Sequence, residues 1–157
     1  MIRPARLPAD KPAILRFIQG LQDFERAIEA DRRTDAKVAE EFYDEITDRV
    51  QKRNGQILIA ELEGRAVGWA VVYAEENEIY VLAEERNNAY ISELFVREER
   101  RGTGVGRALI TACENWARAK GITVMMIGVL SGNTHADALY RRAGFVPYAL
   151  QLRKHLR

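Results

Sequence analysis

A glycine-rich turn is the strongest chemical feature of the sequence. It reads Arg101-Gly102-Thr103-Gly104-Val105-Gly106 and stands between a predicted strand and a predicted helix. Glycine permits positive φ and close approach of a ligand, and a helix start adds free N–H groups and a positive dipole end. The turn therefore predicts a phosphate or pyrophosphate site, with Arg100, Arg101 and Arg107 adding charge. The alternative is a turn that only connects the strand to the helix.

Two better-known phosphate motifs do not fit this turn. No Gly-Lys-Ser or Gly-Lys-Thr follows it, as a P-loop would require. No acidic residue closes a strand about 20 residues later, and the preceding segment is not the first βαβ unit of a dinucleotide-binding domain.

Composition favours one ordinary domain over residues 1–157. Lys and Arg total 24 against 23 Asp and Glu, which gives no support to a nucleic-acid reader. The single cysteine, Cys113, excludes an intrachain disulfide and a thiolate zinc cluster, and we expect no metal. Residues 1–6 carry charge and proline where a signal peptide needs an apolar run, and no apolar run approaches about 20 residues. We expect a cytoplasmic protein with no membrane partner.

The apolar pattern predicts strands alternating with helices around one mixed central sheet, an α/β (α+β) fold. Asp10 is the expected N-cap of the first helix, and Phe145 starts an expected last strand in which Tyr148, Leu150 and Leu152 alternate. Residues 79–82 are a further candidate for the sheet. The expected strands are 2–6, 56–62, 66–73, 90–96 and 122–129, and the expected helices are 10–24, 35–53, 105–120 and 134–144.

The region from 90 to 146 resembles the Gcn5-related N-acetyltransferase (GNAT) superfamily. The resemblance rests on Arg101-x-x-Gly104-x-Gly106, Leu94-Phe95-Val96, Asn133, Ala138-Leu139-Tyr140 and Gly144-Phe145. Ile2-Arg3-Pro4-Ala5 and Ile14-Leu15-Arg16-Phe17-Ile18 also look like the diamine/spermidine acetyltransferase branch. The resemblance implies a GNAT-like acyltransferase fold and acetyl-CoA as co-substrate.

The resemblance also implies roles for particular residues. Backbone N–H groups of residues 102–107 would hold the pyrophosphate, and a splayed strand at Leu94-Phe95-Val96 would pair with the pantetheine arm. Tyr140 would be the general acid, with an ordinary half-buried tyrosine as the alternative. Asn133 would contact the cofactor arm; the alternative is a residue that only begins a helix.

Glu93 is the candidate general base, acting through a water, or else the anchor for an ammonium group. Strand alternation predicts that Glu93 and Phe95 share one face while Ser92 and Leu94 share the other. The diamine/spermidine branch usually carries a second carboxylate where this chain has Ser92. The alternative for Glu93 is a solvated strand residue.

The resulting hypothesis is an acetyl-CoA-dependent N-acetyltransferase that acts directly on a primary amine of a small molecule. An acidic segment over 75–85 either steers a cationic amine toward the site or is a solvated loop. Other candidates are a protein N-terminal or lysine acetyltransferase and a non-catalytic acyl-CoA-binding sensor. Residues 148–156 offer a strand for a partner chain, so a homodimer is expected.

Overall fold

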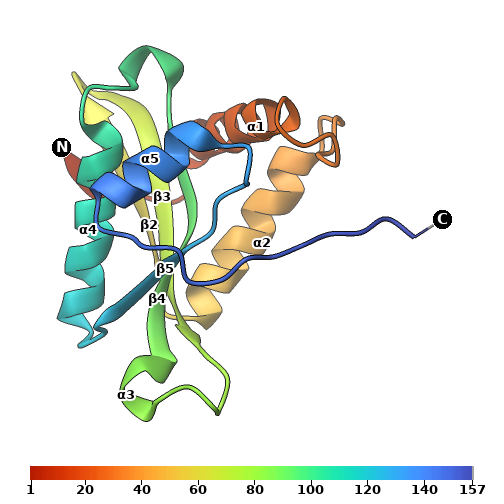
Figure 1. Ribbon diagram of the computed structural model, residues 1–157. Helices are drawn as coiled ribbons and strands as arrows, with labels where there is room; N and C mark the ends of the chain where they lie inside the picture. Colours follow the sequence, from red (N-terminus) through yellow and green to blue (C-terminus); the bar gives the residue numbers. More distant parts are fainter. Residues whose placement is uncertain (157) are drawn as a thin grey trace.

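Five strands form one sheet in the order β1-β2-β3-β4-β5 in the computed structural model, which describes residues 1–156 (Figure 1). Neighbouring strands are antiparallel except for β4 and β5, which run parallel and are joined through helix α4. The strands are β1 (Ile2–Pro4), β2 (Gln56–Leu62), β3 (Arg65–Glu76), β4 (Asn87–Val96) and β5 (Val124–Ile127). The helices are α1 (Lys11–Arg26), α2 (Val38–Lys52), α3 (Ala83–Arg86), the 3-10 turn η1 (Glu98–Arg100), α4 (Val105–Ala119) and α5 (Thr134–Arg142).

Helices α1 and α2 cover one face of the sheet. Their apolar residues recur at helical spacing, so that Ile14, Phe17 and Ile18 of α1 and Ile46 of α2 are buried together. They pack on alternate residues of the sheet, including Trp69 and Val71 of β3. This layer places the C-terminal end of α1 beside the C-terminal end of β4.

Helix α4 covers the other face. Leu109 and Cys113 are fully buried in this second core, against Leu58 of β2 and Val72 of β3. The chain leaves β4, turns through the glycine segment, runs back along α4 and enters β5 as a parallel neighbour of β4. The glycine turn connects β4, through the short η1, to the start of α4. It therefore lies near the C-terminal end of β4.

Asp10 precedes α1 as predicted, but its carboxylate does not cap a helix N–H group. It accepts hydrogen bonds from both terminal nitrogens of Arg3, at 2.7 and 2.9 Å, and from the backbone N–H of Arg6 at 2.6 Å. The hydrogen bonds from Arg3 lower the pKa of the Asp10 carboxyl. Asp10 therefore ties β1 to the start of α1.

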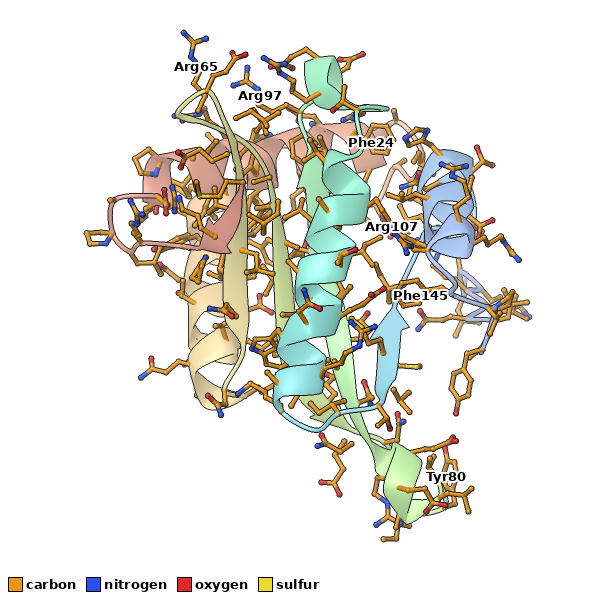
Figure 2. All side chains as sticks on the ribbon, turned by 90° about the vertical axis from the view of Figure 1, so that its left-hand side faces the viewer. Phe24, Arg65, Tyr80, Arg97, Arg107 and Phe145 are labelled. Carbon is orange, nitrogen blue, oxygen red and sulfur yellow. The ribbon has the colours of Figure 1, made fainter. Side chains whose placement is uncertain are left out.

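Two strand predictions are wrong. The expected last strand from Phe145 onward has no sheet pairing. Phe145 packs against the second core, whereas residues 146–156 form an exposed arm that makes no ladder with any strand of residues 1–156. Residues 79–82 do not extend the sheet either. They form the tip of the long β3–β4 hairpin, ahead of α3, with Tyr80 pointing into solvent (Figure 2).

Replacing Leu109 with alanine should destabilise the fold by about 2–5 kcal/mol, because it removes buried contacts and leaves a cavity under α4. Urea denaturation followed by circular dichroism measures the change. The same exchange at Leu82, which is exposed on the hairpin, is the control and should change stability by less than about 0.5 kcal/mol. Equal losses at both sites would contradict the assignment of Leu109 to the core.

Candidate functional site

The glycine turn adopts the backbone that its sequence predicts. Gly102 and Gly104 have φ values of 73° and 90°, in the left-handed region. A Cβ atom at either position would meet no heavy atom within 4 Å, so the backbone conformation alone calls for glycine. No side chain caps α4, and its first backbone bond runs from the Ala108 N–H to the Gly104 carbonyl at 3.0 Å. Helix geometry therefore leaves the preceding N–H groups for an anion.

Arg101 is held in place at this turn. Its Nε donates to the Val96 carbonyl at 3.0 Å, and its guanidinium lies over the rings of Phe24 and Phe95, at 4.9 and 5.6 Å from their centroids. The residue thus joins the end of β4 to α1, and its charge stays beside the turn. Arg107 is exposed on the side of α4 that faces α5 (Figure 2), 3.5 Å from the Arg142 carbonyl.

The parallel strands β4 and β5 part halfway along β4. Their pairing covers Asn88–Ile91 of β4 and Val124–Ile127 of β5, whereas β4 continues to Val96. Residues 92–96 therefore pair only with β3, except at the bulge described next. On the β5 side, Leu94, Phe95 and Val96 have no partner strand, and the Val96 carbonyl accepts from Arg101. Pairing of this segment with a cofactor arm stays a prediction.

A β-bulge lies where the strands part. Val71 of β3 is opposite Glu93 while Val72 is opposite Ile91, so Ser92 is the extra residue. The prediction that Ser92 shares a face with Leu94 is wrong, because the bulge breaks the alternation and both Ser92 and Glu93 line one cavity. The Ser92 Oγ is buried and has no hydrogen-bond partner among the described residues.

This cavity has a volume of about 280 Å³ and lies between α1, α2 and β4. Glu25 and Glu93 are its carboxylates, and Glu25 is paired with Arg32, whose Nε lies 2.8 Å away. The lining residues are Ile18, Leu21, Gln22, Glu25, Arg32, Phe42, Ser92 and Glu93. The acidic residues of 75–85 are not among them. These residues belong to the β3–β4 hairpin. The glycine turn lies at one end of the sheet, and this hairpin extends from the other end (Figure 1).

Glu93 is a perturbed acid in this cavity. Burial, helped by the charges of Glu25 and Glu45 and opposed by Arg49, raises its pKa to about 8. Its carboxyl makes no hydrogen bond or ion pair with any of residues 1–156. At neutral pH the group is largely protonated, and an ammonium ion bound beside it would favour the ionised form. A carboxyl that titrates near neutral pH suits a general base or an ammonium anchor.

Tyr140 shares this electrostatic environment. It is buried on α5, with its ring 6.1 Å from that of Phe145. Burial raises its pKa to about 12, and the negative charges of Glu25 and Glu93 contribute. The charge of Glu93 thus acts on Tyr140, although the two residues lie far apart in the sequence. A phenol in this state remains protonated across physiological pH and can donate a hydrogen bond.

Asn133 begins α5. Its side-chain oxygen accepts a hydrogen bond from the Ala136 N–H at 3.1 Å. Asn133 is therefore the N-cap. Asn133 thus begins the helix, as the alternative expected, and its contact with a cofactor arm stays a prediction.

Comparison with known proteins adds the family. The sequence model of the acetyltransferase (GNAT) family matches residues 21–145, most of the chain. The chain belongs to this family. The GNAT assignment agrees with the β4 and β5 separation and the glycine turn described above. No branch within the family is distinguished by this match.

Curated relatives match parts of the chain. An L-methionine sulfoximine/L-methionine sulfone acetyltransferase of Pseudomonas aeruginosa is 42% identical over 52 residues, which is 33% of this chain and 30% of that protein. A mycothiol acetyltransferase of Streptomyces coelicolor is 33% identical over 98 residues, which is 60% of this chain and 28% of that protein. The chain thus aligns with under a third of either relative's length.

Solved structures share the GNAT fold along the whole chain. A tetramutant of the BH1408 protein from Bacillus halodurans superposes with a TM-score of 0.85 at 21% identity, covering 99% of both chains. An aminoglycoside 6'-N-acetyltransferase from Acinetobacter haemolyticus gives 0.74 at 16% identity, covering 100% of this chain and 99% of that one. These likenesses show a common architecture.

Some residues of the cavity escaped sequence reasoning. Arg32 and Phe42 lie outside every motif, and only the folded chain brings them to β4. Glu25 did not escape: Asp23, Glu25 and Glu29, near the end of the first helix, are acidic candidates for the substrate side from the sequence, and of the three only Glu25 lines the cavity. Among residues 1–156 no helix is long and apolar enough to cross a membrane, and no group of three or more potential ligands could hold a metal ion.

The raised pKa of Glu93 predicts a pH-dependent effect on stability. Between the ordinary glutamate pKa of 4.5 and about 8, the unfolded chain releases this proton while the folded chain keeps it, so rising pH favours unfolding. Glu93→Gln should remove this loss. Its stability relative to the native chain should improve by roughly 2–4 kcal/mol from about pH 5.5 to pH 8.

Urea midpoints of both proteins at the two pH values measure this difference. Glu84→Gln, at an exposed position on α3, is the matched control and should show no such gain. A constant difference between Glu93→Gln and the native chain at both pH values would contradict the burial of Glu93 as a neutral acid.

Proposed function

We propose that this chain is an N-acetyltransferase that moves an acetyl group directly from acetyl-CoA to a primary amine of a small molecule. One observation carries the proposal: the charge of Glu93, beside the point where β4 and β5 part, acts on the buried phenol of Tyr140. The glycine turn stands at the end of the same strand. An acceptor cavity, a donor slot and an anion site would thus meet at one place.

The donor side fits acetyl-CoA, which GNAT acetyltransferases use as co-substrate. The turn offers backbone N–H groups of residues 102–107, and the first turn of α4 contains no acidic residue that would repel a pyrophosphate. The free edge of β4 at Leu94, Phe95 and Val96 would pair with the amide groups of the pantetheine arm. Arg101 and Arg107 would add positive charge nearby, and Asn133 would contact the arm.

Glu93 would prepare the acceptor. An amine arrives mainly as its ammonium ion, which an ionised Glu93 would attract and deprotonate directly or through a water. The neutral nitrogen then attacks the thioester carbon, the C–N bond forms, and the C–S bond breaks. Two protons leave the nitrogen in all. One is released to solvent and the other balances the proton given to sulfur.

Tyr140 would supply the proton to the departing sulfur. Its pKa of about 12 lies above the usual thiol value near 8.5, which opposes the transfer in water. Burial acts on thiols in the same direction, however, and raises the pKa of Cys113 in this domain to about 12. A thiolate formed in the buried site would therefore be a stronger base than one in water. The difference between the pKa of Tyr140 and that of the departing thiol would then be smaller.

The cavity favours a small cationic acceptor. Glu25 is paired with Arg32, so the Glu93 carboxyl is the one left for an ammonium group, and a volume of about 280 Å³ suits a small molecule. The two curated relatives act, by their names, on methionine derivatives and on a mycothiol compound. A diamine or polyamine acceptor remains part of the proposal. We also propose a cytoplasmic location and a homodimer.

Titration calorimetry with acetyl-CoA, and with ATP as a control, tests the donor site. Thiol release from the same sample is then measured over amino acids, diamines, polyamines and a lysine peptide. Binding with amine-dependent thiol release supports the proposal and identifies the acceptor class. Thiol release with the lysine peptide alone would favour a protein acetyltransferase. Binding of acetyl-CoA without thiol release would favour a sensor. No binding of acetyl-CoA would refute the donor site.

Tyr140→Phe should lower kcat by about 10²–10⁴-fold while leaving the affinity for acetyl-CoA within a few fold, because it removes only the proton donor. Thiol-release kinetics and calorimetry give the two values. Tyr80→Phe, on the exposed hairpin tip, should match the native chain in both. Unchanged turnover in Tyr140→Phe would remove Tyr140 from the mechanism.

Gly104→Ala should weaken acetyl-CoA binding, because a side chain at φ 90° strains the turn that presents the N–H groups. Gly64→Ala is the matched control: Gly64 has φ 71°, an equally open surround and a place in the β2–β3 hairpin. Both variants should lose about 1–2 kcal/mol of stability. Only Gly104→Ala should raise the dissociation constant, and equal binding by both variants would count against the anion site.

A further inference from the structure

The side-chain hydroxyl of Ser92 is a buried polar group that no step above uses. Its Oγ is buried and forms no hydrogen bond with any of residues 1–156. Leaving a hydroxyl buried without a partner costs free energy, and native proteins leave few such groups unpaired. The hydroxyl is therefore suited to a hydrogen bond with a molecule from outside the chain.

The β-bulge in β4 explains how Ser92 reaches the cavity. In a regular strand the side chains of Ser92 and Glu93 would lie on opposite faces of the sheet. Ser92 is instead the extra residue of the bulge, and both side chains line the cavity of about 280 Å³. Bulges of this kind re-aim side chains beside functional sites. The bulge therefore puts two consecutive polar side chains on one wall of the cavity, at the point where β4 leaves β5.

The other polar side chains that line the cavity already have partners. The Glu25 carboxylate accepts from the Nε of Arg32 at 2.8 Å, and the Gln22 amide donates to a backbone carbonyl at 3.3 Å. Neither Ser92 nor Glu93 forms a hydrogen bond through its side chain within residues 1–156. The remaining lining is apolar and consists of Ile18, Leu21 and Phe42. Ser92 and Glu93 are thus the two polar groups of the cavity wall that are left for a ligand.

A nitrogen that carries N–H groups fits this pair. An ammonium ion has only donors, whereas a hydroxyl and a carboxylate both accept. The hydroxyl is neutral, so it can still accept an N–H after the nitrogen has given a proton to Glu93. A second carboxylate in its place would favour the charged nitrogen and oppose that loss. Ser92 therefore suits a nitrogen that must become neutral before it reacts.

We propose that Ser92 is a further catalytic residue that holds the acceptor nitrogen: its Oγ accepts one N–H while Glu93 takes the proton whose loss makes the nitrogen nucleophilic. Ser92 itself gives up no proton. A primary amine keeps an N–H on Ser92 until the amide has formed, whereas a secondary amine must give up its last N–H at that step. The hydroxyl therefore favours primary amines. This inference rests on the proposed function and adds a residue to it.

Two substitutions of the same shape test the hydroxyl. Ser92→Thr keeps it, and Ser92→Val replaces it with a methyl group. With n-propylamine and acetyl-CoA as substrates, kcat/KM for the amine should be roughly 10–100-fold lower for Ser92→Val than for Ser92→Thr, because one hydrogen bond to the nitrogen is lost. The affinity for acetyl-CoA, measured by calorimetry, should be the same in both. The preference for n-propylamine over N-methylpropylamine should be smaller in Ser92→Val.

The stability of the ligand-free chain tests the same hydroxyl without any turnover. Ser92→Ala removes a buried group that has no partner within residues 1–156, so its urea midpoint should lie above that of the native chain. Ser131→Ala, at the exposed second serine of the sequence, is the matched control and should leave the midpoint unchanged. An unchanged or lower midpoint for Ser92→Ala would mean that the hydroxyl already has a partner, and would overturn the inference.

Binding of the nitrogen separates failure of this inference from failure of the proposed function. Propylammonium chloride should raise the urea midpoint of the native chain more than tetramethylammonium chloride, whose cation has no N–H group, and Ser92→Ala should reduce this difference. If that holds and no amine releases thiol from acetyl-CoA, the nitrogen site stands and the proposed transfer fails. If n-propylamine is acetylated equally well by Ser92→Thr and Ser92→Val, or if both salts stabilise the native chain equally, the role of Ser92 is refuted.

Discussion

The separation of β4 from β5 after Ile91 and Ile127 is the constraint on which the rest of the site depends. Buried backbone groups need hydrogen-bond partners, and two parallel strands that part leave a row of such groups unpaired. A ligand with its own amide groups can satisfy that row. The glycine turn lies at the end of the same strand, so one ligand can contact both. A continuous ladder from Asn88 to Val96 would close this slot.

The bulge at Ser92 has a second consequence. It turns Glu93 into the cavity on the α1 and α2 side, while Leu94 and Val96 still pack under α4. Burial raises the pKa of Glu93 in this cavity to about 8 and that of Tyr140, on α5, to about 12. Both groups are thereby kept protonated in the absence of ligand, and an ionised Glu93 makes ionisation of Tyr140 less favourable. A cationic acceptor would favour the ionised form of Glu93, while Tyr140 would stay protonated and able to donate a proton.

Local patterns in the sequence predicted much of the fold and part of the site. The glycine turn, the helix that follows it and the strand before it depend on neighbouring residues, and all three are confirmed. The acidic segment over 75–85 was a candidate rim, but the length of the β3–β4 hairpin carries it away from the cavity. The alternation of residues 92–95 predicted the face of Ser92 wrongly, because a bulge depends on the partner strand. The sequence did not indicate that Arg32 and Phe42 line the cavity, because their place there depends on how the helices pack on β4.

The sequence by itself determined the turn that can hold an anion, because positive φ at Gly102 and Gly104 is a property of those residues and their immediate neighbours. It also determined the family. Only the tertiary structure decided that Glu93, Glu25 and Tyr140 share one environment, since their mutual effect depends on distances that chain spacing does not give. It also decided that the apolar residues after Phe145 do not join the sheet. A strand exists only where another strand supplies its hydrogen bonds, and within residues 1–156 none pairs with the arm.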